Sequence, residues 1–209
     1  MTEARAAGSE REHFQVVIVG AGQAGLAAGY HLRRAGIRFV ILDAGGRIGD
    51  SWRNRWGSLH LFTPARIDGL PGMRFPAAAN DLPSKDAMAD YLEAYVERFM
   101  LPVRSGQRVT ALDAEDGRYL VTVNDRPIEA DQVIVATGAN QCPRIPGLAA
   151  DLAPSSTPLS AADYSPPSQF KPASFLARGP AHAGTGRGSA GPRTPTASPS
   201  ATGTWPRAR

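Results

Sequence analysis

Three glycines with GxGxxG spacing, Gly20, Gly22 and Gly25, stand where the sequence changes from a strand pattern to a helix pattern. They follow an apolar, β-branched run at 14–19 (FQVVIV). A second apolar run ends in Asp43, 21 residues after Gly22. A strand, a glycine turn, a helix and a second strand ending in an acid form the arrangement that binds a dinucleotide. The carboxylate can accept hydrogen bonds from both ribose hydroxyls, and it repels a 2′-phosphate, which disfavours NADP at this position.

Each part of this motif has its own expected task. Gly20 makes the tight turn, Gly22 lets the backbone approach a pyrophosphate, and Gly25 lets the helix pack closely on the strand. The helix N-terminus at Gln23 and Ala24 presents free N–H groups and the positive end of the helix dipole to the phosphates. The alternative is a glycine-rich turn in an unrelated α/β domain, and the flanking strands and the acid favour the dinucleotide site.

The elements that must position the motif alternate between helix and strand patterns. Residues 23–35 have helix-forming composition and stop at Gly36. Residues 84–100 carry an apolar stripe with helical spacing, and Ser84 can cap this helix. Residues 44–83 are expected to be irregular. Further strands are predicted at 37–42, 102–112, 119–123, 126–129 and 132–136.

These elements together predict an α/β fold of the Rossmann type. We expect a partly parallel sheet with the first helix on one face, and an antiparallel meander at 118–130 packed as a small side layer. The strands expected in the partly parallel sheet are 14–19, 37–42, about 107–112 and 132–136.

The composition changes near residue 150. Residues 177–209 contain no Val, Ile, Leu, Met or Phe, so they cannot bury enough apolar surface to offset the entropy of ordering. We therefore predict a flexible N-terminus at 1–12, a dinucleotide-binding domain at 13–150, a poorly ordered segment at 151–176 and a disordered tail at 177–209.

The charge distribution argues against some partners. Residues 1–150 hold 17 basic and 17 acidic residues, so the net charge of +4 comes from residues 151–209. Nucleic-acid binding needs clustered Lys and Arg, so no nucleic-acid partner is expected. No apolar run approaches the roughly 18 residues of a membrane span, and the N-terminus has no apolar signal segment. We expect a cytoplasmic protein, and the sequence does not indicate its oligomeric state.

The reactive side chains give no catalytic assignment. A single cysteine, Cys142, excludes an intramolecular disulfide, a CxxC redox pair and a cysteine-rich zinc site. No HExxH motif, Ser/His/Asp grouping or paired-carboxylate spacing stands out, so no catalytic residue and no metal site are predicted.

Four pieces of sequence resemble the flavin-containing monooxygenase group, which includes bacterial flavoproteins often described as NAD(P)/FAD-dependent oxidoreductases. The resemblance runs from residue 14 to about 165, in order and with natural spacing. It implies FAD as the cofactor. The matching pieces are GAGQAGLAAGYHL at 20–32, ILDAGGRIGDSW at 41–52, LFTP at 61–64, and Ala136-Thr137-Gly138 followed by Pro143 and Pro146.

The resemblance also assigns roles. It places the FAD pyrophosphate on the glycine motif, the ribose on Asp43, and the flavin's ribityl chain and ring under the loop 45–52. We favour a flavin contact over core packing for Trp52, whereas Trp56 is expected in the core and Arg53 and Arg55 in a solvated loop. The residues expected to contact FAD are Gly20, Gly22, Gln23, Ala24, Gly25, Asp43, Ala44, Gly45, Gly49, Ser51, Trp52, Val109, Ala136, Thr137 and Gly138.

The resemblance stops near residue 171. Full members of the group carry a second GxGxxG unit, which binds the NADPH that reduces the flavin, and these 209 residues contain no such unit. The resemblance therefore implies a truncated FAD-dependent monooxygenase that binds FAD weakly or not at all and performs no coupled oxygenation. The tail is either an out-of-frame translation or a native extension, and the substrate is not indicated.

Other functions occur on the same fold. A pyridine nucleotide–disulfide reductase needs two redox cysteines close together, which a single cysteine excludes. An amine-oxidase-like flavoprotein would lack its substrate domain here. An NAD-binding Rossmann module would leave the purified protein colourless, and an inactive nucleotide-binding remnant would show no flavin bleaching by NADPH.

Overall fold

The computed structural model describes residues 11–139 and residue 163. The predicted segments 151–176, apart from residue 163, and 177–209 lie outside the described residues, as do Cys142, Pro143 and Pro146. Within the described residues the strands are β1 (His13–Val19), β2 (Phe39–Leu42), β3 (Val103–Arg104), β4 (Val109–Glu115), β5 (Arg118–Val123) and β6 (Arg126–Val135). The helices are α1 (Gln23–Arg34), α2 (Asp50–Arg53), α3 (Ala65–Asp68) and α4 (Lys85–Phe99).

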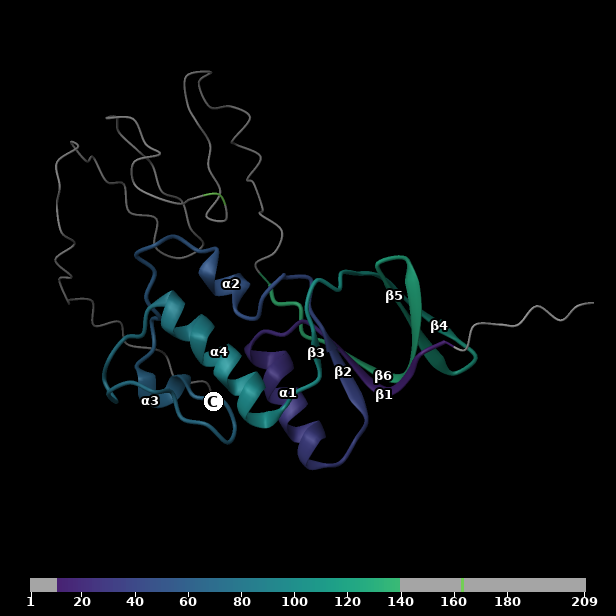
Figure 1. Ribbon diagram of the computed structural model, residues 1–209, viewed down its shortest axis with the longest axis horizontal. Coiled ribbons are helices and arrows are strands. Elements are labelled where there is room, and N and C mark those ends of the chain that lie inside the picture. Colours follow the sequence, from purple (N-terminus) through teal and green to yellow (C-terminus); the bar gives the residue numbers. More distant parts are fainter. Residues whose placement is uncertain (1–10, 140–162, 164–209) are drawn as a thin grey trace, which may run out of the picture. The chain divides into compact units, whose positions relative to one another are not determined.

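The strands form one mixed sheet in the order β3-β2-β1-β6-β5-β4 (Figure 1). β1 pairs in parallel with β2 on one side and with β6 on the other, and β2 pairs in parallel with β3. β5 pairs antiparallel with both β6 and β4. The predicted α/β fold is confirmed, and the carboxyl ends of four parallel strands meet at one edge of the sheet.

The predicted strand at 102–112 is wrong in extent. Gly106 adopts a left-handed φ of +68° and turns the chain, so the segment divides into β3 and β4. The fourth parallel strand is therefore β3, whereas the predicted 107–112 lies partly in the antiparallel β4. The irregular segment predicted at 44–83 also contains the two short helices α2 and α3.

The predicted strands 126–129 and 132–136 are a single strand, β6. Ala130 is paired on both sides, in parallel with Phe14 of β1 and antiparallel with Tyr119 of β5. One continuous strand therefore serves both the parallel sheet and the meander, and no break separates the two.

The two faces of the sheet are buried by different elements. Ile18 and Ile41 pack against α1 and α4, which lie side by side in Figure 1. On the opposite face, Val17 and Val40 pack with Val121 and other residues of the meander. The meander thus covers a face of the sheet as predicted, and it is also hydrogen-bonded into the sheet through β6.

The predicted ends of the helices are supported by their caps. Ser84 Oγ accepts a hydrogen bond from the Ala87 N–H at the start of α4, and Gly36 follows α1 with a φ of +70°. No helix among the described residues is long and apolar enough to cross a membrane. Glu12, the last residue of the segment predicted to be flexible, accepts hydrogen bonds from Arg104 at 2.6 and 2.7 Å.

Candidate functional site

Four loops converge at the carboxyl edge of the parallel strands. They are residues 20–25 after β1, 43–45 after β2, 105–107 after β3 and 136–138 after β6. Ligands of open α/β sheets bind at this edge. The structure therefore brings together the glycine motif, Asp43 and the Ala-Thr-Gly turn, as the sequence predicted.

The first and third glycines of the motif are required by close packing. Gly20 has a φ of +107°, and a Cβ at this position would lie 2.5 Å from the carbonyl oxygen of Ala136. A Cβ on Gly25 would lie only 1.9 Å from the carbonyl oxygen of Gly20. These contacts confirm the tight turn and the close approach of α1 to β1.

Gly22, in contrast, faces open space. It is the N-cap of α1 with extended backbone angles, and no side chain caps the helix. Apart from Gly22 and its two chain neighbours, no atom of the described residues lies within 4 Å of the position that a Cβ would take. Gln23 and Ala24, the first residues of α1, are exposed. The helix start therefore leaves room for an anionic group next to backbone N–H groups.

The Asp43 carboxylate points into the glycine turn. Its Oδ2 accepts a hydrogen bond from the Ala21 N–H at 2.7 Å, and its Oδ1 accepts one from the Gly45 N–H at 2.8 Å. The side chain is half-buried, and each carboxylate oxygen has a further lone pair. Asp43 thus joins the first loop to the second while keeping acceptor capacity for a ligand hydroxyl.

The loop after β3 holds Asp43 by backbone hydrogen bonds, and the sequence motifs did not predict this contact. The Gln107 N–H donates to the Asp43 carbonyl at 2.7 Å, and the Gly106 N–H donates to the Gly45 carbonyl at 2.8 Å. The Asp43 N–H in turn donates to the Arg104 carbonyl at 3.0 Å. Val109, a predicted adenine contact, lies two residues past Gln107 and is half-buried. Only the turn residue Gly106 offered a sequence signal for this loop.

The turn after β6 borders the glycine motif directly. The Ala136 N–H donates to the Val19 carbonyl at 2.8 Å, and a Cβ on Gly20 would meet the Thr137 Cα at 3.3 Å. Gly138 has a φ of +76°, which favours glycine. Thr137 and Gly138 are exposed beside the first loop.

The segment that follows Asp43 packs on α4. Gly49 has a φ of +85°, and its Cβ would lie 2.8 Å from Ala89, so only glycine allows this approach. Ala44 and Ser51 are exposed, whereas Trp52 is half-buried and packs against the core cluster beneath α4. Core packing, the alternative considered for Trp52, is therefore present in the structure.

The expectation that Arg53 lies in a solvated loop is wrong. Its side chain is 17% exposed and forms ion pairs with Asp90 and Glu93 of α4. Spacing along the chain gave no sign of these partners, since they lie 37 and 40 residues away. Arg55 is half-buried, and its Nε donates to the Ser51 carbonyl at 3.2 Å.

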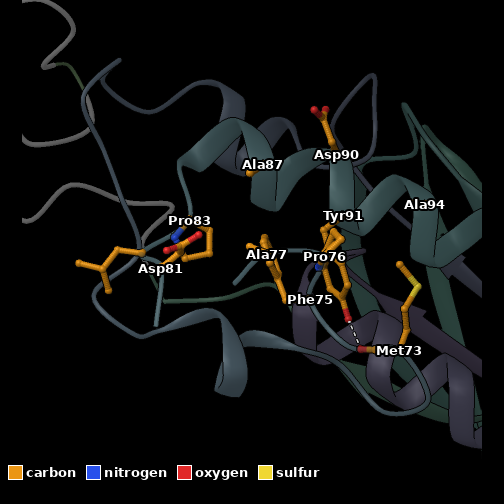
Figure 2. Close-up of a pocket in the computed structure, with 11 residues that line it drawn as sticks. Met73, Phe75, Pro76, Ala77, Asp81, Pro83, Ala87, Asp90, Tyr91 and Ala94 are labelled. Atoms are coloured by element: carbon orange, nitrogen blue, oxygen red, sulfur yellow. Dashed lines mark hydrogen bonds between the residues drawn. The ribbon is translucent and has the colours of Figure 1, made fainter. Parts of the chain in front are cut away.

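A separate groove of about 640 Å³ lies between α4 and the segment 73–83 (Figure 2). Its floor includes Phe75 and Tyr91, and the Tyr91 hydroxyl donates to the Met73 carbonyl at 2.7 Å. None of the predicted FAD contacts lines this groove. The predicted nucleotide contacts therefore lie at the edge of the sheet, outside the groove.

The described part of the chain offers no group of three or more His, Cys, Asp and Glu side chains that could hold a metal ion. Among the same residues, His60 is exposed and its ring contacts the Ser58 carbonyl at 3.2 Å. The arrangement therefore supports binding of a nucleotide through backbone N–H groups and one carboxylate.

The family of the chain follows from a match to residues 17–169: the chain belongs to the pyridine nucleotide-disulphide oxidoreductase family. The matched range contains all four loops of the site. Only one cysteine, Cys142, occurs in the 209 residues, so the disulphide chemistry of the family's description has no cysteine pair within this sequence.

Individual relatives are flavin monooxygenases and oxidoreductases. The chain is 43% identical over 169 residues to an uncharacterized CzcO-like oxidoreductase from Geobacillus kaustophilus, covering 81% of this chain and 49% of the relative. It is 37% identical to the indole-3-pyruvate monooxygenase YUCCA1 of Oryza sativa subsp. japonica, covering 62% of this chain and 33% of that protein.

Among solved structures, a mutant of a flavin monooxygenase from Stenotrophomonas maltophilia superposes with a TM-score of 0.71 at 36% identity. The match covers 79% of this chain and 49% of that one. The resemblance to flavin monooxygenases is therefore confirmed in sequence and in fold. The chain spans about half the length of the first curated relatives that it matches.

Proposed function

We propose that this chain is the FAD-binding half of a flavin-dependent monooxygenase, and that it holds the adenosine diphosphate part of FAD. The observation that carries the proposal is the Asp43 carboxylate, bonded to the Ala21 N–H at 2.7 Å beside the open position of Gly22. An acidic side chain next to an uncapped helix start suits a ribose followed by a pyrophosphate. Similarity to flavin monooxygenases supports the same cofactor.

The residues fit this ligand as follows. Gly22 and the N–H groups of Gln23 and Ala24 would hold the pyrophosphate. The remaining lone pairs of Asp43 would accept hydrogen bonds from the ribose hydroxyls. The backbone near Val109 would contact the adenine.

The remaining predicted contacts belong to the flavin end of the cofactor. The loop 45–52, with Gly45, Gly49, Ser51 and Trp52, and the preceding Ala44 would contact the ribityl chain and the ring. Ala136, Thr137 and Gly138 close the site on the β6 side. Trp52 packs against the core cluster and stays half-buried, so the exposed part of its side chain would be available to the flavin.

Bound FAD would supply redox chemistry, taking a hydride from a reduced nicotinamide and passing electrons to dioxygen for the oxygenation of a small organic substrate. The residues of this chain bind and orient the cofactor. We assign the oxygenation itself to a protein as long as the relatives, of which this chain covers about half. We also propose that the protein works in the cytoplasm.

Titration of the purified 209-residue chain with FAD, NAD and NADP tests the proposal. We expect FAD to bind weakly, with a change in flavin fluorescence, because the second nucleotide unit of the full-length group is missing from these 209 residues, and we expect neither nicotinamide cofactor to displace it. A chain that is folded by circular dichroism but does not bind FAD would contradict the proposal. Preferential binding of NAD would instead support a colourless Rossmann module.

A further inference from the structure

The segment between Asp43 and Asn54 is fastened to α4 by a set of charged groups that the nucleotide site does not use. We infer that Glu93 and its two arginine partners, Arg47 and Arg53, form a clamp that positions this segment along the flavin end of the cofactor. The inference rests on the proposed function for the identity of the cofactor, whereas the clamp itself is seen in the structure.

One side of the clamp is a row of residues on α4, separate from the apolar stripe of that helix. Lys85, Ala89 and Glu93 are spaced four residues apart and therefore lie on one face of the helix. This face is distinct from the apolar stripe that packs on the sheet. All three residues contact the segment 47–53: Lys85 and Glu93 by hydrogen bonds, and Ala89 by its close approach to Gly49.

Glu93 binds both arginines with its two oxygens. Arg47 donates from Nε to Oε1 at 2.5 Å and from Nη2 to Oε2 at 2.7 Å, which is a bidentate pair. Arg53 donates from Nη2 to Oε2 at 2.9 Å. Hydrogen bonding to Arg47 and the charges of both arginines hold the pKa of the Glu93 carboxyl below its usual range. The carboxylate is therefore shared between the two ends of the segment.

Arg53 extends the clamp to the backbone. Its Nη1 donates to the Ile48 carbonyl, and its Nη2 also donates to Asp90 at 2.9 Å. Its own carbonyl accepts a hydrogen bond from Lys85 Nζ at 2.9 Å. The side chains of Arg53 and Lys85 are only 17% and 9% exposed, so both make these contacts largely away from solvent.

The clamp reaches the nucleotide site through the backbone. Gly45, whose N–H binds the Asp43 carboxylate, lies two residues before Arg47. The Arg47 N–H donates a hydrogen bond to Asp50 Oδ2 at 2.9 Å, and this bond closes a tight turn at the start of α2. Partly exposed ion pairs contribute little to folding free energy. The consequence of the clamp is therefore the position of residues 44–53 relative to Asp43, more than the stability of the whole domain.

Two variants break the clamp from opposite sides, Glu93→Gln on α4 and Arg47→Gln on the segment. Glu97→Gln, one turn further along α4, is the matched control, because Glu97 is exposed and has no ion pair with the described residues. Hydrogen exchange of the cofactor-free chain is measured first. We expect faster exchange in 44–54 for both clamp variants, unchanged exchange in β1 and β6, and no change for the control.

Affinity for FAD and for ADP is measured next. We expect FAD to bind about fivefold more weakly to both clamp variants while ADP is affected less than twofold, since the clamp acts beyond the ribose. Exchange in 44–54 equal to that of the control, or an equal loss for FAD and ADP, would overturn the inference. Failure of the unmodified chain to bind FAD would refute the proposed function instead, and the exchange data would still decide whether the clamp exists.

Discussion

The Gly22→Ala substitution tests the open space at the start of α1. Gly22 has φ −80° and ψ −173°, an extended conformation that alanine adopts without strain. A methyl group there would meet no atom of the described residues within 4 Å, apart from its own residue and the two chain neighbours. Such a change alters folding free energy by less than about 1 kcal/mol. The methyl group would instead occupy the space that we assign to the FAD pyrophosphate.

The expected loss of affinity follows from the hydrogen bonds that the methyl group displaces. A bond between a backbone N–H and a charged phosphate oxygen contributes about 1.5–3 kcal/mol. Loss of one such bond raises the Kd for FAD by roughly 10- to 150-fold. The assay is isothermal titration with FAD, together with thermal unfolding of the cofactor-free variant, which should match that of the unmodified chain.

Gly25→Ala gives the opposite pattern and serves as the comparison. Its Cβ would have to move from 1.9 Å to the 3.4 Å of an ordinary contact with the Gly20 carbonyl oxygen. Both atoms belong to packed backbone, so we expect a cost above about 4 kcal/mol and loss of the fold. A Gly22→Ala variant that binds FAD as tightly as the unmodified chain would refute the assigned path of the pyrophosphate.

Three further predictions concern stability. Its arginine partners lower the pKa of Glu93, so the stability that this carboxylate contributes should be lost as the pH falls below about 4.3. The Glu93→Gln variant should therefore show urea-unfolding free energies that depend less on pH in that range. Tyr91→Phe should cost about 1–2 kcal/mol at pH 7, because the Leu70 N–H loses its acceptor. Burial raises the pKa of Tyr91, so the unmodified chain should lose the stability contributed by this phenol as the pH rises above about 10. The Tyr91→Phe variant has no phenol to ionise, so the stability difference between the two chains should shrink in that range, as pH-dependent urea unfolding would show. Thr63→Val should lower the free energy of urea unfolding by about 1–3 kcal/mol, because Asp68 is buried and the Thr63 hydroxyl is its one hydrogen-bond donor among the described residues. In an Asp68→Ala background the same substitution should have no such cost.

The sequence predicted those parts of the fold that local pattern determines. The β-branched run before Gly20 and the apolar stripe of α4 have clear periods, so β1 and α4 were placed within one or two residues. Long-range pairing was harder to foresee. Ala130 joins two neighbouring strands at once, and nothing in the local sequence distinguishes that position from the end of one strand and the start of another.

The candidate site divides in the same way. Gly20, Gly25 and Asp43 were recognisable because their residue types are dictated by backbone geometry and by the ligand. The partners of Asp43 from residues 104–107 are backbone groups, which any residue type supplies, so apart from the turn residue Gly106 the sequence carries no signal for them. The prediction that Arg53 is solvated was wrong because its ion-pair partners lie on a helix that is distant in sequence, and local sequence does not reveal them.

Competition between ADP, FMN and FAD for the purified chain tests the central claim most directly. We expect ADP to displace FAD with one-to-one stoichiometry, because both share the adenosine diphosphate that we assign to Asp43 and the glycine turn. FMN, which lacks the adenosine part, should not displace FAD. Displacement of FAD by FMN but not by ADP would show that the cofactor is held by its flavin end, and would contradict the account.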